Sequence, residues 1–314
     1  MNLTTILAAA DVSVPSDQAI DRAAAIATKH GAKLILVHAL ANDAPVGETD
    51  KDVLKHLGEV TAAVRTELAK RLTDKLEALR AHGIDAELVT PTGRPGEVVA
   101  TLARERGAQL IVCGTHGHTG IQRFLLGSVA TAILRHAPCD VLVTRGNAVG
   151  TAFTKPLVAV DFSPASKRAL RAAVALAEPN AAIEVIHAWQ LPAGSVGASF
   201  FGVDRFPWNT IRDAVVSSAK KKGAVLLADN TNLGHPLHLT LVQGAPAPMI
   251  THAAEAGGYD LISIGTHGHG GFRKLLLGSV AEGVIRHANC SVLVVYGEHA
   301  GDTGKFMKVS PPQA

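Results

Sequence analysis

The sequence predicts an α/β fold built as two tandem domains, and three observations carry this prediction. Short apolar runs rich in β-branched residues alternate with amphipathic stretches, a pattern typical of βαβ units and of a parallel sheet covered by helices on both faces. One glycine-rich stretch, GTHGHTGIQRFLLGS at residues 114–128, returns 151 residues later as GTHGHGGFRKLLLGS at 265–279. The chain of 314 residues is also long enough for two domains of common size.

The first copy contains the elements of a five-stranded domain. Apolar runs predict strands at residues 5–10, 33–39, 87–90, 109–113 and 140–144. The stretches between them predict helices at residues 16–31, about 51–82, 95–106 and 128–137. Ser16 and Ser128 are the predicted N-caps, because a serine side chain accepts a hydrogen bond from the free N–H groups that begin a helix. Gly31 and Gly83 are expected to end the first two helices.

The second copy repeats this order. Its strands are predicted at residues 157–160, 184–188, 237–242, 261–264 and 291–295, with a long helix at about 209–229 and a second N-cap at Ser279. We expect domains at residues 1–147 and 153–298, joined by a linker within 146–155. The aromatic segment 191–208 has no equivalent in the first copy. It is interpreted either as a loop packed against the body or as a lid over an apolar pocket.

Composition and charge exclude several classes of protein. The net charge of +3 is mild, and no basic run exceeds the three lysines at 220–222, so nucleic acid is not an expected partner. No apolar stretch approaches the roughly 20 residues that a membrane span needs. The three cysteines form no C-x-x-C pair and the N-terminus lacks a basic region, so we expect a cytoplasmic protein without a signal peptide.

The repeated glycine-rich stretch has the layout of an anion site. In each copy it follows an apolar strand, and its closing Gly-Ser pair leads into a helix. Glycine allows close approach of a ligand to the backbone, and the N–H groups and dipole at the beginning of a helix favour a negative charge. This arrangement predicts a phosphate-binding site in each copy.

Several separated features occur in the same order twice, and together they identify a family. Asp-x-Ser follows the first strand at Asp11 and Asp161, and a histidine ends the second strand at His38 and His187. The G-x-x-G-x9-G-S stretch, a helix ending in Arg-His-Ala and a V-L-V strand complete the pattern. The chain resembles a tandem member of the universal stress protein family, ATP-binding branch. This resemblance implies flavodoxin-like (adenine nucleotide α hydrolase-like) domains, each a five-stranded parallel sheet of order 3-2-1-4-5.

The resemblance also implies a site for ATP, with Mg2+, in each copy. The implied residues of the first copy are Ala9, Asp11, Ala39, Gly114, Thr115, His116, Gly117, Gly127, Ser128 and Val129. Those of the second are Ala159, Asp161, Ala188, Gly265, Thr266, His267, Gly268, Gly278, Ser279 and Val280. The glycine-rich loop and the Gly-Ser pair would hold the phosphates, and the backbone after the strand-two histidine would border the adenine. The aspartate would lie by the nucleoside, where a carboxylate suits ribose hydroxyls or a metal-bound water.

Other interpretations of the same residues stay open. The glycines could form only a tight turn, in a scaffold or small-ligand sensor of the same fold that binds no nucleotide. The two aspartates could simply favour a helix N-terminus. Four histidines, at positions 116, 118, 267 and 269, could hold zinc, although no cysteine or carboxylate shares their spacing. The family often has Arg or Lys where His118 and His269 stand, and Arg94 is matched by Ala245 in the second copy.

The sequence predicts binding and stress signalling, with at most slow ATP hydrolysis. It has no G-x-S-x-G elbow and no complete Walker A motif, and no residue is an evident arginine finger. Cys113, Cys139 and Cys290 are expected to be buried thiols. The fifth strands, which are the usual pairing edges in the family, are expected to pair the two domains within the chain. Homodimerisation of the whole chain is left open.

Overall fold

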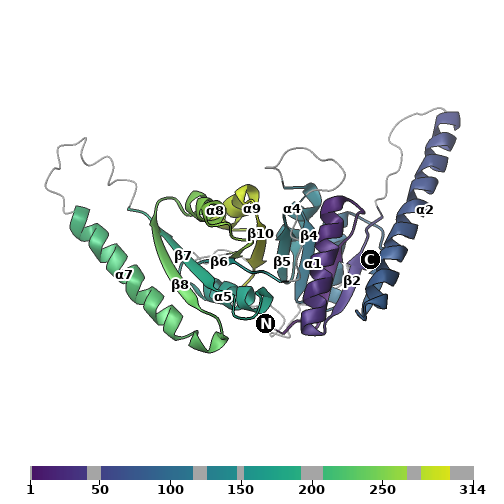
Figure 1. Ribbon diagram of the computed structural model, residues 1–314. Helices are drawn as coiled ribbons and strands as arrows, with labels where there is room; N and C mark the ends of the chain where they lie inside the picture. Colours follow the sequence, from purple (N-terminus) through teal and green to yellow (C-terminus); the bar gives the residue numbers. More distant parts are fainter. Residues whose placement is uncertain are drawn as a thin grey trace, which may run out of the picture.

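The protein consists of two similar α/β halves that share one sheet (Figure 1). The computed structural model describes residues 2–40, 51–115, 126–146, 152–191, 208–266 and 277–297. The aromatic segment at 192–207 and the chain beyond residue 297 lie outside these ranges.

The first half supplies five strands and four helices to the described structure. The strands are β1 (Thr5–Ala9), β2 (Lys33–Val37), β3 (Ala86–Val89), β4 (Leu110–Gly114) and β5 (Asp140–Thr144). The helices are α1 (Val14–His30), α2 (Lys51–Ala81), α3 (Pro95–Glu105) and α4 (Ser128–His136). The predicted elements are all present, and their ends differ from the prediction by a few residues at most.

The second half repeats the series. Its strands are β6 (Pro156–Ala159), β7 (Ile183–Trp189), β8 (Leu237–Gln243), β9 (Leu261–Gly265) and β10 (Ser291–Val295). Its helices are α5 (Pro164–Leu176), α7 (Trp208–Ala228), the 3-10 turn η2 (Thr231–Leu233), α8 (Pro246–Gly257) and α9 (Ser279–His287).

The sheet runs in the order β3-β2-β1-β4-β5-β10-β9-β6-β7-β8. Within each half the strands are parallel, and each half has the expected order 3-2-1-4-5. The fifth strands β5 and β10 lie side by side and run antiparallel, with Leu142 opposite Leu293. This pairing joins the halves through main-chain hydrogen bonds and leaves neither fifth strand as an open edge.

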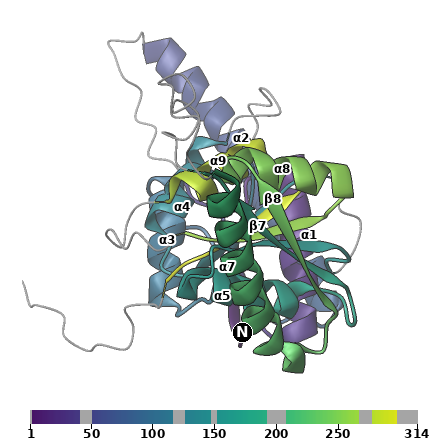
Figure 2. The same ribbon diagram turned by 90° about the vertical axis from the view of Figure 1, so that its left-hand side faces the viewer.

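Alternate strand residues face opposite layers of helices. Ile6 packs in the core layer that contains Ile20 of α1 and Leu72 of α2, and the next residue, Leu7, packs in the layer that contains Val99 of α3 and Ile133 of α4. The second half has the same two layers, with α5 and α7 on one face and α8 and α9 on the other. α2 and α7 lie at opposite ends of the molecule (Figure 1), and Figure 2 shows the end that carries α7.

The helix that follows β1 begins earlier than the sequence predicts. The N-cap of α1 is Ser13, whose side chain accepts a hydrogen bond from the N–H group of Ser16. Ser16 was the predicted cap, and that prediction is wrong. Its hydroxyl instead accepts a hydrogen bond from the N–H group of Asp11, at 3.0 Å. Pro15 explains the earlier start, because proline is well suited to the first turn of a helix.

Part of the predicted linker is packed into the body. Phe153 is fully buried, forms a bridge with Ala177 and lies under the guanidinium of Arg22, 4.3 Å from the ring centroid. The next residue, Thr154, donates its N–H and its hydroxyl to the carboxylate of Asp260. The chain between the halves is therefore anchored to both of them at this point.

Candidate functional site

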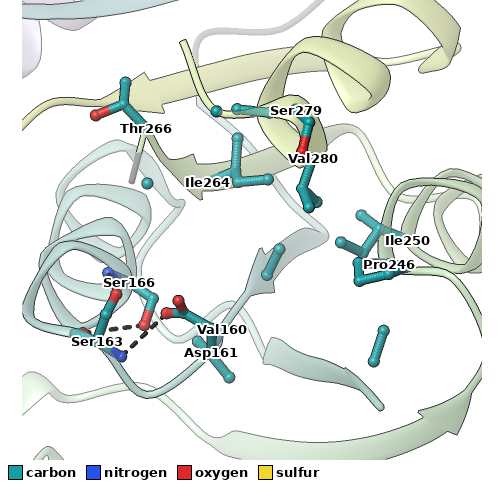
Figure 3. Close-up of a pocket in the computed structure, with 15 residues that line it drawn as sticks. Val160, Asp161, Ser163, Ser166, Pro246, Ile250, Ile264, Thr266, Ser279 and Val280 are labelled. Carbon is teal, nitrogen blue, oxygen red and sulfur yellow. Dashed lines mark hydrogen bonds between the residues drawn. The ribbon is translucent and has the colours of Figure 1, made fainter. Parts of the chain in front are cut away.

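Each half has a cavity at the carboxyl end of its sheet. Adjacent strands β1 and β4 in the first half, and β6 and β9 in the second, lead to helices in opposite layers, and such a reversal opens a crevice beyond the strand ends. The cavity has a volume of about 240 Å³ in the first half and about 220 Å³ in the second. Figure 3 shows the second one, with residues from α5, α8 and α9 around it.

The predicted site residues that the structure describes all line these cavities. In the first half they are Ala9, Asp11, Ala39, Gly114, Thr115, Gly127, Ser128 and Val129. In the second they are Ala159, Asp161, Ala188, Gly265, Thr266, Gly278, Ser279 and Val280. His116, Gly117, His267 and Gly268 lie outside the described residues. Segments more than 100 residues apart in the chain thus meet around each cavity.

Glycine is required where the strand end meets neighbouring backbone. A Cβ on Gly114 would lie 2.9 Å from the carbonyl oxygen of Pro15, in the first turn of α1. A Cβ on Gly265 would lie 3.0 Å from Ala165 of α5, and one on Gly278 would lie 2.5 Å from the carbonyl oxygen of Thr266. These distances are below ordinary van der Waals contact, so a side chain at any of the three would displace the main chain that forms the cavity.

The helices α4 and α9 begin at the cavities without a side-chain cap in the described part of the chain. Their N-cap residues are Gly127 and Gly278. Ser128 and Ser279 are the first helical residues, so the prediction that they are the N-caps is wrong. The N–H groups of the two glycines donate to the carbonyls of Thr115 and Thr266, at 2.7 and 2.9 Å.

This start differs from that of the helices on the opposite side of each cavity. α1 and α5 are capped by the side chains of Ser13 and Ser163. At α4 and α9, the N–H groups of the first turn have no partner within the helix, because the first four N–H groups of any helix lack one. An anion in the cavity could accept hydrogen bonds from them, and the helix dipole would favour its charge.

The aspartate of each half lies between the cavity and a helix start. Asp11 Oδ1 accepts hydrogen bonds from the N–H and the hydroxyl of Ser13, at 3.0 and 2.5 Å. Asp161 Oδ1 accepts one from the N–H of Ser163, at 3.0 Å (Figure 3). Each carboxylate thus lines a cavity and also accepts hydrogen bonds at a helix N-terminus, so its two predicted roles are compatible in this geometry.

The strand-two histidines are held by the main chain. His38 Nδ1 lies 2.8 Å from the carbonyl oxygen of Ala10, and His187 Nδ1 lies 2.8 Å from that of Val160. A carbonyl only accepts, so Nδ1 is the protonated nitrogen in the neutral ring. Both histidines are thus oriented by a hydrogen bond to the main chain, and both are half-buried. His38 also lines the first cavity, which the sequence analysis did not anticipate.

The apolar wall of each cavity was not predicted from the sequence. Pro95, Val99 and Cys113 line the first cavity, and their counterparts Pro246, Ile250 and Ile264 line the second. The repeat offers a signal for these residues, because the spacing from Pro95 to Gly114 is the same as the spacing from Pro246 to Gly265. Burial raises the pKa of the Cys113 thiol to about 12, so this cysteine is not a reactive thiolate at neutral pH.

Two other predicted features can be placed relative to the cavities. The Arg94 side chain is 84% exposed and lies 3.4 Å from the Glu97 carboxylate, and it is not among the residues that line the cavity. Among the described residues no cluster of His, Cys, Asp and Glu could hold a metal ion. The histidines of the zinc interpretation, at positions 116, 118, 267 and 269, lie outside that part of the chain.

The cavity geometry, repeated in both halves, coincides with a family match over nearly the whole chain. The model of the universal stress protein family matches residues 2–145 and again 152–296. The chain belongs to this family. It is a tandem member, with one family domain in each half.

Relatives of known sequence have the same assignment. A universal stress protein of Mycolicibacterium smegmatis is 28% identical over 306 residues, which span 92% of this chain and 96% of that protein. A putative universal stress protein of Staphylococcus haemolyticus is 33% identical over 158 residues, which cover 50% of this chain and 93% of the relative. The first relative thus aligns with both domains, and the second is similar in length to one of them.

Solved structures of similar shape span both halves. A putative universal stress protein from Pseudomonas aeruginosa superposes with a TM-score of 0.65 at 19% identity, covering 94% of this chain and 93% of its own. One from Archaeoglobus fulgidus has a TM-score of 0.62 at 21% identity, covering 93% and 96%. At this identity the likeness supports the fold. No helix in the described ranges combines the length and apolar character of a membrane span.

Proposed function

We propose that this universal stress protein acts in the stress response by binding an adenine nucleotide, ATP with Mg2+, in each of its two cavities. Family membership supports the stress-response role. The nucleotide is our inference, and the observation that carries it is the start of α4 and α9: two helices begin at a cavity with glycine N-caps and no side-chain cap in the described chain. A phosphate group suits such a helix start.

The residues around each cavity fit the parts of a nucleotide. Cavities of about 240 and 220 Å³ are smaller than the roughly 300 Å³ at which pockets for drug-sized ligands begin. Their size suits a nucleoside, with the phosphates near the helix start. The apolar walls, with Val99 in the first half and Ile250 in the second, offer a surface for a flat base.

The chain's own groups would act on the ligand by orientation and charge. The first-turn N–H groups of α4 and α9 would donate to phosphate oxygens. The carboxylates of Asp11 and Asp161, fixed by the helix starts beside them, would accept hydrogen bonds from ribose hydroxyls. When bound, Mg2+ would offset part of the phosphate charge. We propose binding without efficient turnover. Rapid phosphoryl transfer needs a group that orients water and a cation that stabilises the transition state, and the sequence has no evident arginine finger.

Isothermal titration with Mg-ATP tests the proposal, and we expect two nucleotides per chain. Ser128→Asp and Ser279→Asp provide variants that block one cavity each. A carboxylate in the first turn favours the helix but repels phosphate, so each variant should fold normally and lose one binding event. The double variant should bind none.

The matched control is Ser128→Ala with Ser279→Ala, which keeps the main-chain donors and adds no charge, so both binding events should remain, with an affinity lowered only by the loss of the two hydroxyls. Wild-type protein that binds no Mg-ATP would contradict the proposal and favour a scaffold of the same fold. Unchanged binding by the double aspartate variant would contradict the placement of the phosphates.

A further inference from the structure

The two halves exchange side chains just beyond their paired fifth strands. Arg145 follows β5 and extends into the second half, and Tyr296, at the equivalent position 151 residues later, follows β10 and extends into the first. The Arg145 guanidinium donates to the carbonyl oxygen of Ala288 at 2.6 Å and to that of Ile285 at 2.7 Å. Both carbonyls belong to the C-terminal end of α9.

The same helix forms the second cavity with its other end. α9 has nine residues, and its beginning, at Gly278, Ser279 and Val280, lines the cavity of the second half. A helix moves largely as a rigid body, so a contact that fixes its last turn also fixes its first turn. Arg145 supplies two hydrogen bonds and a positive charge at the negative end of the helix dipole. Burial lowers the pKa of Arg145, yet an arginine remains protonated at neutral pH.

A second cation from the first half has the same relation to α5. Lys29 Nζ, at the end of α1, donates to the carbonyl oxygens of Ala175 and Ala177, at 2.9 and 2.6 Å. These carbonyls lie at the C-terminal end of α5, and the beginning of α5, at Ser163 and Ser166, lines the second cavity. Of the described helices whose N-terminal ends border that cavity, α5, α8 and α9, two are therefore held at their far ends by cations of the first half, namely α5 and α9.

The reciprocal contact is neutral. The Tyr296 hydroxyl donates to the carbonyl oxygen of Leu134 near the end of α4, the helix that begins at the first cavity. Burial raises the pKa of Tyr296, so the hydroxyl stays protonated. At these equivalent positions, the second half receives a guanidinium and the first half receives a hydroxyl.

We propose that Arg145 is a positioning residue of the second cavity, supplied by the first domain, and that Lys29, at the end of α1, supports it by holding the end of α5. The first domain thereby sets the anion affinity of the second. This inference rests on the proposed nucleotide site. It predicts a one-sided effect, because the loss of Arg145 removes charge and hydrogen bonds from α9 and leaves α4 unchanged.

The test measures each cavity separately by titration with Mg-ATP. In the Ser128→Asp background only the second cavity binds, and there Arg145→Met should raise its Kd about threefold to tenfold. Arg145→Lys should recover part of the loss, since it restores the charge but not both hydrogen bonds of the guanidinium.

In the Ser279→Asp background, where only the first cavity binds, Arg145→Met should change Kd by less than about twofold. Lys29→Met, at an exposed residue outside the hydrophobic core, should show the same one-sided loss if Arg145→Met does not fold.

Ser291→Ala is the matched interface control. It removes the hydrogen bond from the Arg145 N–H to the Ser291 hydroxyl, 3.2 Å long, and leaves both helix ends in place. We expect lower thermal stability and an unchanged Kd. Equal losses in both cavities, or an equal loss in Ser291→Ala, would overturn the inference while nucleotide binding itself stands. Wild-type protein that binds no Mg-ATP would remove both proposals.

Discussion

The two halves build the same helix contact from opposite residues. In the first, Gly96 of α3 faces Ala132 of α4, and a Cβ on Gly96 would lie 2.4 Å from the Ala132 methyl group. In the second, the equivalent positions are exchanged: Gly283 of α9 faces Ala247 of α8, at 2.8 Å from a Cβ placed on the glycine. The crossing has room for one methyl group, and either helix can supply the glycine. The two copies thus share the close approach of two helices, although the glycine and the alanine stand on opposite helices in the two copies.

The interface between the halves shows the opposite behaviour, because equivalent positions carry different chemistry. Asp140 at the start of β5 accepts a hydrogen bond from the N–H of Tyr296 at 3.0 Å, and its counterpart Ser291 accepts one from the N–H of Arg145. Backbone pairing of β5 with β10 supplies the symmetric part of the interface. The side chains make the two halves unequal, and each half can be altered to resemble the other.

The largest expected effect concerns the second cavity alone. In Gly278→Leu, the side chain would begin 2.5 Å from the carbonyl oxygen of Thr266, which belongs to the main chain and cannot swing away. Such overpacking costs roughly 1–3 kcal/mol, and the upper end of that range corresponds to about 100-fold in affinity. Titration with Mg-ATP should show one binding event where the wild type shows two.

The steric control for this change is Gly297→Ala, because the nearest atom to a Cβ there is the Arg168 Nη2 at 3.9 Å. It should leave both binding events intact. Two binding events in Gly278→Leu would mean that the second cavity does not hold the ligand at the start of α9.

The next effect concerns the unequal interface and depends on pH. Burial raises the pKa of Asp140 to about 6, against hydrogen bonding by the Tyr296 N–H and the charge of Arg168. The folded protein therefore binds this proton more tightly than the unfolded chain does. The stability that the protonated Asp140 carboxyl contributes is fully present below its ordinary pKa near 3.8 and is lost as the pH rises through about 6.

Asp140→Ser installs the residue of the other half and removes this dependence. Between about pH 4 and pH 7, the free energy of unfolding of the variant should gain about 2–3 kcal/mol relative to the wild type. Urea unfolding at a series of pH values measures the difference. Parallel pH profiles for the two proteins would show that Asp140 does not titrate in this range.

The smallest effect tests the exchanged helix contact. Gly96→Ala should lower the free energy of unfolding by about 1–2 kcal/mol, because a second methyl overpacks the crossing while alanine favours the helix. Gly96→Ala combined with Ala132→Gly exchanges the residues as in the second half and should recover part of the loss, because a Cβ at position 96 also lies 2.9 Å from the carbonyl oxygen of Val129. Denaturant titration of the single and double variants gives the coupling. Simple additivity of the two single changes would contradict the exchange.

The sequence by itself was sufficient for the scaffold. Alternating apolar and amphipathic stretches predicted the strands and helices, because burial on two faces of a parallel sheet imposes that pattern. The repeat predicted two domains, and the family pattern implied the strand order that the structure confirms. The described members of the predicted site, such as Asp11 and Gly127, all line a cavity. Their role in binding a nucleotide stays a prediction.

Capping was decided by local geometry that composition does not reveal. Ser13 and Ser16 are both plausible caps in the sequence, and Gly127 and Ser128 likewise adjoin the start of one helix. The choice depends on which residue adopts an extended backbone where the chain enters the helix. Ser13 and Gly127 do so, with ψ of 158° and 154°, far from the value in a helix. Residue preference alone favours serine at both helix starts, and at α4 this preference gives the wrong residue.

Contacts between the halves were decided only by the tertiary structure. No periodicity links Arg145 to the end of α9, or Lys29 to the end of α5, because these partners are more than 100 residues apart and meet only after β5 pairs with β10. Local sequence fixes the strands and helices since hydrophobic burial has a short period along the chain. Which side chain reaches a distant carbonyl depends on how two completed domains pack, and that is a property of the assembled sheet.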